Sequence, residues 1–241
     1  MRPVLDEAVE APVLLVACDY DGTLAPIVDD PADAHPDARA IDALRTLSAL
    51  PDTVVAVISG RARADLAGFL GEMPGVIVIG GHGAEWENAD TTPEADALAS
   101  ALRDVAAHFP GSTVEPKPTG AAFHYRQLID GDTAGDAAEA AIDAVADQAN
   151  SVLHGKRVVE FSTSDADKGA ALRRLREEIS PDVIVFIGDD VTDEHAFASL
   201  GPSDVAVKVG DGETIAPWRL TRQADVAPLL EELGSRRAII D

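Results

Sequence analysis

Continuous apolar runs mark the sequence at regular points. Residues 13–18 and 183–187 are apolar throughout, without polar residues in alternation, and shorter runs of this kind occupy residues 54–58 and 76–79. Such runs are typical of parallel strands that are buried on both faces of a sheet. They predict an α/β fold whose core is a Rossmann-like, doubly wound parallel sheet.

The region from about residue 90 to residue 165 has a different pattern. It contains two alanine-rich amphipathic helices, and in the second, over residues 134–149, acidic side chains line the face opposite the apolar one. Four strand-like segments accompany the helices: 113–117, 121–126, 152–154 and 157–161. Pro116 and Pro118 exclude a central place in a sheet for the first of these segments. We therefore expect residues 90–165 to form a smaller, inserted α/β cap domain, with 1–89 and 166–241 forming the core.

Two of the buried runs end in acidic residues. Asp19 and Asp21 follow the first run, and Asp189 and Asp190 follow residues 183–187. An isolated Asp-x-Asp also ends strands and caps helices without any chemical role, but neighbouring parallel strands would bring both acidic groups to one sheet edge, where open α/β sheets bind ligands. Carboxylates so close together need a compensating cation, which favours a hard metal ion with oxygen ligands.

The motifs around these acids resemble those of a known family. The stretch DYDGTLAPI at 19–27 and the stretch GDDVTDEHAF at 188–197 resemble the first and last signature motifs of the haloacid dehalogenase superfamily of phosphotransferases. The ordered set of intermediate motifs is similar, more narrowly, to the trehalose-6-phosphate phosphatase family. These motifs are Ile58 to Arg61, Gly80 to Glu85, Glu115 to Lys117, His124 to Arg126, Lys168-Gly169 and Val209 to Gly212.

The resemblance implies roles for the core residues. Asp19 would be the nucleophile and Asp21 the general acid and base, with Lys168 beside the nucleophile. Ser59, Gly60 and Lys168 would bind the phosphate. Mg²⁺ would be held by Asp19, Asp21 and Asp189. Asp190 would support these ligands without binding the ion itself.

The lysines are few, because only four of the 19 basic residues are lysine. Lys168 is predicted at a helix start, where the helix dipole disfavours a cation, so a negative partner is expected there. Lys208 is expected to be a surface cation at a strand edge. Ser59 also fits a turn or helix cap, and Arg61 fits either a substrate contact or a surface arginine at a helix start.

The resemblance also implies how the sugar is bound. Glu115, Lys117 and Glu160 of the cap would meet sugar hydroxyls, and further substrate contacts would come from His82, Arg61 and Arg126. The alternative is that the three cap residues form ordinary surface ion pairs. One departure concerns Phe161-Ser162, where arginine followed by proline is expected after the glutamate.

The charge of the chain limits its partners and environment. The net charge of −24 excludes nucleic acid as a partner. It fits either a salt-adapted cytoplasm, where molar salt shortens the Debye length to about 3 Å, or simply an acidic, alanine-rich proteome. The single Cys18 fits a reducing compartment. No apolar run has membrane-spanning length, so no contact with a membrane is expected. The expected setting is the cytoplasm, and a monomer is the default expectation.

Together the motifs predict a Mg²⁺-dependent phosphatase that hydrolyses trehalose 6-phosphate to trehalose and phosphate through an aspartyl-phosphate. A trehalose-phosphate synthase is the expected functional partner. The alternatives are a phosphatase for another sugar phosphate, such as sucrose phosphate or mannosyl-3-phosphoglycerate, a phosphomutase, and a non-catalytic sensor of sugar phosphates.

Overall fold

The four apolar runs form neighbouring strands of one parallel sheet. They are β1 (Leu14–Cys18), β2 (Thr53–Ile58), β3 (Val76–Ile79) and β8 (Val183–Gly188). With β9 (Val205–Val209) and β10 (Trp218–Leu220) they make a six-stranded sheet in the order β10-β9-β8-β1-β2-β3. Strand β1 lies between β8 and β2, with Cys18 beside Ile187 and Val57. The two strands that end in acids are therefore adjacent, which is the arrangement that brings both acidic groups to one edge of the sheet.

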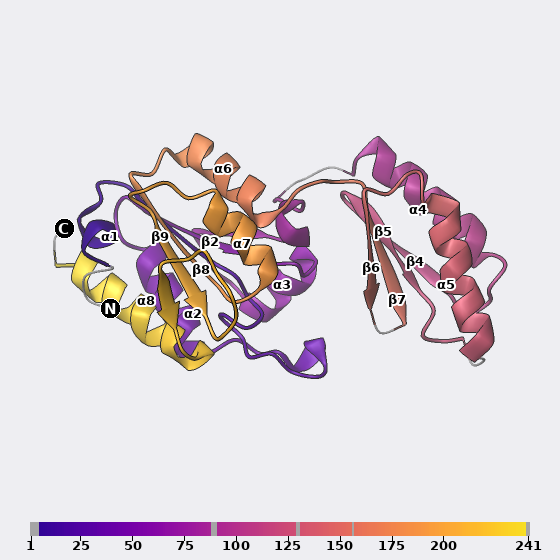
Figure 1. Cartoon of the computed structure of the whole chain (residues 1–241), viewed down its shortest axis with the longest axis horizontal. Helices are drawn as coiled ribbons and strands as arrows, with labels where there is room; N and C mark the ends of the chain where they lie inside the picture. Colours follow the sequence, from indigo (N-terminus) through magenta and orange to yellow (C-terminus); the bar gives the residue numbers. More distant parts are fainter. Residues whose placement is uncertain (1–4, 88–90, 129–130, 156, 240–241) are drawn as a thin grey trace. The chain divides into compact units, whose positions relative to one another are not determined.

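The computed structural model describes residues 5–87, 91–128, 131–155 and 157–239. The chain divides into two compact units. The core unit comprises Met1–Glu87 with Ala166–Asp241, and the second unit comprises Asn88–Asp165 (Figure 1). None of the described helices is both long and apolar enough to cross a membrane.

Helices cover both faces of the core sheet. On one face lie α1 (Asp6–Glu10), α2 (Ala38–Ser48), α3 (Arg63–Leu70) and α8 (Val226–Arg237). On the other face lie α6 (Lys168–Ile179) and α7 (Val191–Ala198). Alternate residues of β1 serve the two sides, since Leu14 and Val16 belong to the first apolar cluster and Leu15 and Ala17 to the second. This confirms the predicted doubly wound α/β core.

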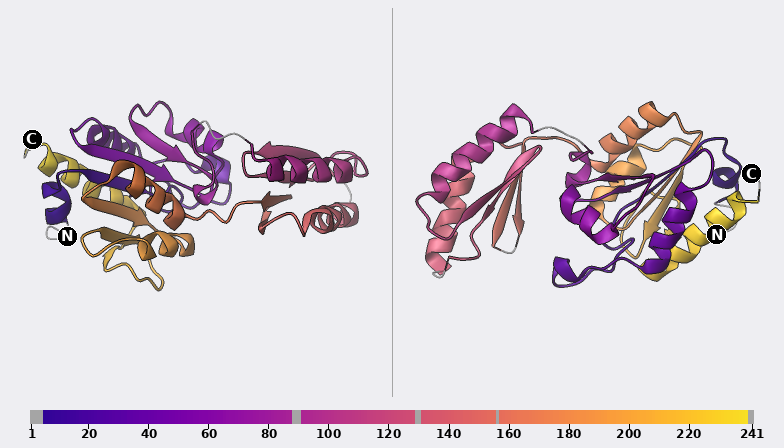
Figure 2. Two further views of the ribbon diagram at one scale, coloured as in Figure 1. Left: turned by 90° about the horizontal axis from the view of Figure 1, so that it is seen from above. Right: turned by 180° about the vertical axis from the view of Figure 1, so that it is seen from behind.

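The second unit has its own sheet and its own apolar core. Helices α4 (Pro93–Ala106) and α5 (Gly131–Val145) pack on one face of a four-stranded antiparallel sheet (Figure 2). The strand order is β4-β5-β7-β6, with bounds Thr113–Lys117, Gly120–His124, Val158–Ser162 and Ser151–Gly155. Strand β4 is an edge strand, as its prolines predicted. Helix α5 begins and ends a few residues earlier than the predicted 134–149. The N–H groups of Gln148 and Ala149 donate to the Val145 carbonyl in the turn that follows it.

Candidate active site

The turn after β1, which carries Asp19 and Asp21, lies close to Asp189 of the second acidic group. The Leu24 and Ala25 N–H groups both donate to the Tyr20 carbonyl, at 2.8 Å, which closes the turn. Gly22 has a φ of 78°, and a Cβ on it would lie 2.0 Å from Oδ2 of Asp189. Glycine is therefore required here twice, for its backbone conformation and for the close approach of the Asp189 carboxylate.

Three carboxylates form a cluster at the carboxyl edge of the sheet. One oxygen each from Asp19, Asp189 and Asp193 lies within 4.8 Å of the others. Burial raises the pKa of Asp19 well above its ordinary value, although the charge of Lys168 opposes the shift. Burial likewise raises the pKa of Asp189 to about 6. Both shifts arise first from burial, which disfavours the charged form of a carboxyl group, and the negative charge of Asp193 adds to them.

Asp193 is the site residue that the sequence analysis missed. It is fully buried, and its Oδ2 accepts the N–H groups of Asp189 and Asp190, at 2.8 and 2.9 Å. Its carboxylate occupies the space over Gly188, where an added Cβ would lie 2.3 Å from its Cγ. The available signal was the spacing, because an acid three residues after Asp190 at a helix start is placed to form a capping box with it.

Lys168 links the cluster to helix α6. Its Nζ lies 2.7 Å from Oδ1 of Asp19 and 2.7 Å from Oδ1 of Asp193, and the residue is 2% exposed. Burial lowers the pKa of Lys168, but the two carboxylates outweigh burial and raise it above its ordinary value. The expected negative partner at this helix start is thus a pair of carboxylates, and the lysine remains a cation.

Asp21 is held by an arginine. Nε and Nη2 of Arg61 each donate to one carboxylate oxygen of Asp21, at 2.7 Å. The guanidinium stacks on the rings of Tyr20 and Phe69, at 5.2 and 4.7 Å from their centroids. The Asp21 carboxylate, as the main cause, raises the pKa of Arg61. Arg61 is therefore an oriented, partly buried residue of the site and not a free surface arginine.

Ser59 and Gly60 form a backbone loop that is fixed by the loop after β3. The His82 N–H donates to the Ser59 carbonyl and the Gly81 N–H to the Arg61 carbonyl, both at 2.9 Å. The imidazole of His82 packs on Gly60, where a Cβ would lie 2.4 Å from Cε1 of the ring. Ser59 is buried, and its hydroxyl accepts the Arg61 N–H at 3.1 Å, so the expected turn geometry is present at the site itself.

The cluster fits a hard divalent cation. Its donors are all carboxylate oxygens, Oδ1 of Asp189 is buried without a hydrogen-bond partner among the described residues, and the carboxyl groups of Asp19 and Asp189 are in direct contact. Two carboxylates cannot satisfy each other without a shared proton or a cation. Oxygen-only ligation is the chemistry that Mg²⁺ prefers.

Two expectations about this edge of the sheet need correction or refinement. Lys208 is not a surface cation, because β10 pairs outside β9 and the lysine is 4% exposed. Asp190 is exposed and is the N-cap of α7, where it shares a capping box with Asp193. Asp190 is therefore linked to the cluster through Asp193, which belongs both to this capping box and to the cluster.

The predicted sugar-binding residues of the second unit share one face of its sheet. Glu115 and Glu160 both lie in register with Ala122, on the face opposite the one that packs on the helices. Nζ of Lys117 lies 3.1 Å from Oε2 of Glu160, and Oε2 of Glu115 accepts from Nε2 of His124 at 2.8 Å. Arg126 is exposed beyond the end of β5. The structure therefore contains ion pairs of the kind that the alternative interpretation predicted. The same face of the sheet also carries all three predicted sugar-binding residues, Glu115, Lys117 and Glu160.

The structure explains the departure at Phe161. Its side chain is buried in the apolar core between the sheet and helices of the second unit. It therefore points away from the face that carries Glu160, and an apolar residue suits this position.

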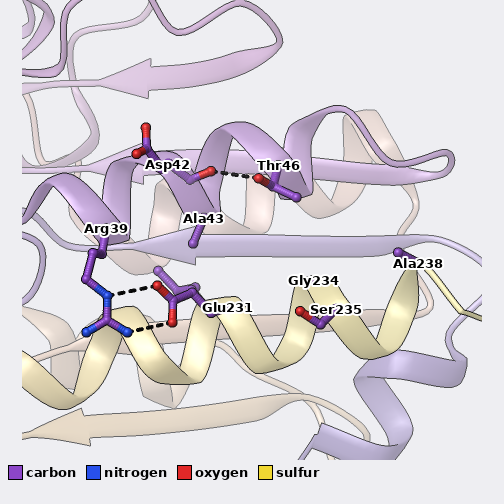
Figure 3. A pocket seen from close by; sticks show the side chains of 9 residues that line it. Arg39, Asp42, Ala43, Thr46, Glu231, Gly234, Ser235 and Ala238 are labelled. Carbon is purple, nitrogen blue, oxygen red and sulfur yellow. Dashed lines mark hydrogen bonds and ion pairs between the residues drawn. The ribbon is translucent and has the colours of Figure 1, made fainter.

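A separate hollow of about 450 Å³ lies between α2 and α8 (Figure 3). There the guanidinium of Arg39 donates to both carboxylate oxygens of Glu231, at 3.0 and 2.7 Å. None of the predicted site residues lines this hollow, so the acidic cluster remains the candidate active site.

Comparisons with known proteins show the family to which the chain belongs. A parallel α/β sheet with a cluster of aspartates at its carboxyl edge defines a class of proteins that bind their ligands at this edge. The model of the trehalose-phosphatase family matches residues 17–223, and the chain belongs to this family.

Relatives and solved structures extend the similarity. The chain is 38% identical over 230 residues to a bifunctional trehalose-6-phosphate synthase/phosphatase of Thermoproteus tenax, covering 91% of this chain and 32% of that protein. It is 37% identical over 240 residues to a trehalose-phosphate phosphatase of Mycobacterium marinum, covering 90% and 60%. The structure of the C-terminal domain of Candida albicans trehalose-6-phosphate phosphatase has a TM-score of 0.67 and 27% identity, covering 97% and 96%. The chain thus spans about a third to three fifths of these curated relatives.

Proposed function

We propose that this chain is a Mg²⁺-dependent phosphatase that hydrolyses trehalose 6-phosphate to trehalose and phosphate. The observation that carries the proposal is the hydrogen-bonded set of Asp19, Lys168 and Asp193 beside Asp189 at the edge of the sheet. Membership of the trehalose-phosphatase family supports the substrate.

Asp19 is the nucleophile of the proposed reaction. Its carboxylate oxygen attacks phosphorus, the P–O bond to the sugar breaks, and an aspartyl-phosphate forms. The pair of bonds from Lys168 to Asp19 and Asp193 fixes the direction of the Asp19 carboxylate and offsets its charge. Ser59, Gly60 and Lys168 bind the phosphate, whose developing charge needs such donors.

Asp21 moves the protons in both halves of the reaction. It gives a proton to the leaving sugar oxygen, and then takes a proton from the water that attacks the aspartyl-phosphate. In the present arrangement both of its oxygens accept from Arg61. Arg61 also has phosphate as an alternative acceptor, so substrate binding provides a way to release Asp21.

Asp19, Asp189 and Asp193, together with Asp21, are the residues we assign to Mg²⁺. When bound, the ion supplies neutralisation of the carboxylates and of the phosphate. Asp190 keeps the helix start of this group in place through its capping box.

We assign the sugar hydroxyls to Glu115, Lys117 and Glu160, with His82 and Arg126 as further substrate contacts. Their shared sheet face and the packing of His82 on Gly60 support this assignment. A polar group that the bound sugar covers without offering it a hydroxyl partner is costly, and this cost would give these residues their selectivity.

The proposed setting is the cytoplasm, supported by a single buried cysteine that has no partner within this sequence. A trehalose-phosphate synthase is the proposed functional partner, since the Thermoproteus tenax relative is described as a synthase/phosphatase. We propose a monomer.

Phosphate release from a panel of sugar phosphates tests the proposal, with Mg²⁺, at low and at molar salt. We expect selective release from trehalose 6-phosphate, and a loss of at least about 10³-fold in kcat for Asp19→Asn. Arg39→Gln on the opposite face of the sheet is the control and should retain activity. Broad release would favour a general sugar phosphatase, and no release at any salt concentration would favour a sensor.

A further inference from the structure

Lys208 is a second buried lysine of the core unit, and the proposed reaction gives it no role. It lies on β9 in register with Gly188, and only 4% of it is exposed. Val205, Val207 and Val209 pack toward the face of α2 and α8, whereas Ala206 packs toward α6 and α7. By the alternation of strand side chains, Lys208 shares the face of Ala206, which is the face of Lys168 and Asp193.

The sheet register places this lysine next to the acidic cluster. Gly188 lies between Lys208 on β9 and Asp19, since the Asp19 N–H donates to the carbonyl of Ile187 at 2.9 Å. The space over Gly188 is filled by the carboxylate of Asp193. Across this edge of the sheet, the order of the residues is therefore Lys208 on β9, Asp193 over Gly188 of β8, and Asp19 after β1.

Lys208 lies beside the start of the second acidic group. Asp189, a metal-ligand candidate, directly follows Gly188, which is the register partner of Lys208. No hydrogen bond or ion pair of the Lys208 ammonium is found among the described residues. A cation on a largely buried side chain is stabilised by nearby negative charge, and the Asp193 carboxylate lies on the same face of the sheet, over Gly188.

The total charge of the cluster suggests what the lysine does. Arg61 offsets the charge of Asp21. When the other three carboxylates are ionised, they and the two ammonium groups leave one negative charge, and a divalent cation would convert it to one positive charge. A phosphate dianion is attracted to the positive site. Without Lys208 the metal-free cluster would carry two negative charges and the metal-loaded cluster none.

We propose that Lys208 is a positioning residue that sets the charge of the metal-loaded site, weakening the binding of Mg²⁺ in order to strengthen the binding of the phosphate group. It acts through the carboxylates of Asp189 and Asp193. This inference rests on the proposed function, because it assumes that the cluster holds Mg²⁺ and then phosphate.

Direct binding measurements on the full chain test the inference. Calorimetric titration gives the affinity for Mg²⁺ alone and then, at saturating Mg²⁺, the affinity for inorganic phosphate. For Lys208→Met we expect Mg²⁺ to bind at least about threefold more tightly and phosphate at least about threefold more weakly. Lys208→Arg keeps the charge and should leave both affinities near those of the wild type. Arg39→Gln removes one positive charge from the opposite face of the sheet and controls for net charge.

Opposite changes in the affinities for Mg²⁺ and phosphate distinguish an electrostatic role of Lys208 from a merely structural one. If both affinities weaken in Lys208→Met, or if neither changes, the inference is wrong. Should Lys208→Met fail to fold, Lys208→Gln gives the same comparison with a polar side chain.

A wild type that binds no Mg²⁺ would overturn the metal assignment and this inference together. If the wild type binds both ligands and the Lys208 variants bind them with the same affinities, only this inference is overturned.

Discussion

At the scale of single residues, the site depends on close contacts that leave no room for larger side chains. Gly22, Gly60 and Gly188 each face a side chain of the site at less than 2.6 Å from an ideal Cβ. The neighbouring groups are Asp189, His82 and Asp193, in that order. These glycines are therefore part of the site geometry, although they carry no functional group.

Replacing Gly22 by alanine tests this dependence. At a φ of 78°, with Oδ2 of Asp189 only 2.0 Å from the new Cβ, we expect a loss of about 1–3 kcal/mol in the free energy of unfolding and weaker Mg²⁺ binding. Chemical denaturation and calorimetry measure the two effects. Gly68→Ala in helix α3 is the control, because nothing lies within 4 Å of its Cβ and alanine favours a helix by about 1 kcal/mol. Equal stability of the two variants would contradict the expectation.

The metal-free protein should lose stability as the pH rises through the titration of the cluster. The folded-state pKa of Asp189 is about 6, above its ordinary 3.8, so the native state holds a proton that the unfolded state has lost in this range. The contribution of Asp189 is fully present below pH 3.8 and is lost as the pH passes through about 6. The raised pKa of Asp19 acts in the same direction.

Thermal unfolding in chelator between pH 4 and pH 7 checks this pH dependence. Other groups contribute to the overall curve, so the measured quantity is the difference between the wild type and Asp189→Asn. We expect the variant to gain stability relative to the wild type as the pH rises, and saturating Mg²⁺ to reduce that gain. A difference that does not change with pH would contradict the prediction.

At the scale of elements, helix α8 is attached to the start of the sheet by one buried arginine. Nη1 of Arg237 donates to the Ala11 carbonyl at 2.7 Å, Nε donates to Oγ1 of Thr53 at 2.7 Å, and Nη2 donates to the Asp52 carbonyl at 3.1 Å. The residue is buried, and its acceptors lie at the segments that lead into β1 and β2. It thereby connects the last helix with the first two strands.

Lysine cannot reproduce this set of bonds, because it has one terminal nitrogen instead of a planar fork. We expect Arg237→Lys to lower the free energy of unfolding by about 2–4 kcal/mol, as buried carbonyl oxygens lose their donors. Urea denaturation measures the loss. The control is Arg39→Lys, since Arg39 also forms a two-bond pair but is exposed, and an exposed pair contributes at most about 1 kcal/mol. A loss no larger than that of the control would show that Arg237 is dispensable.

The strands and helices were also the elements that the sequence predicted best. Continuous apolar runs do not depend on which strand lies beside them, so the four strands could be recognised singly. The position of Lys208 could not, because only the pairing of β10 outside β9 removes β9 from the sheet edge. Similarly, the helix-facing direction of Phe161 follows from the register of β7 with β5.

At the scale of the whole molecule, the net charge of −24 dominates. Repulsion between so many carboxylates opposes the folded state, and salt screens this repulsion, with a Debye length of about 10 Å at 0.1 M and 3 Å at 1 M. The same screening lets an anionic substrate approach an acidic surface.

We therefore expect the midpoint of thermal unfolding to rise by several degrees between about 0.1 M and 2 M KCl. Excluded solutes also stabilise folded proteins without screening charge, so sucrose is the control. If charge screening causes the rise, tetramethylammonium chloride should raise the midpoint as much as KCl does, and sucrose at the same osmolality should raise it less. A flat or falling midpoint in KCl would contradict it.

The sequence by itself determined the α/β class, the strands of the core and the acidic residues at their ends, because apolar runs and strand-end acids are local properties of the chain. It also determined the motifs that indicate phosphotransfer. Only the tertiary structure decided how the acids combine. Asp193 enters the cluster because Gly188 leaves a space over the sheet, and Lys208 approaches it because β9 lies beside β8. Both are consequences of strand register and helix docking, which bring together residues that no local pattern connects.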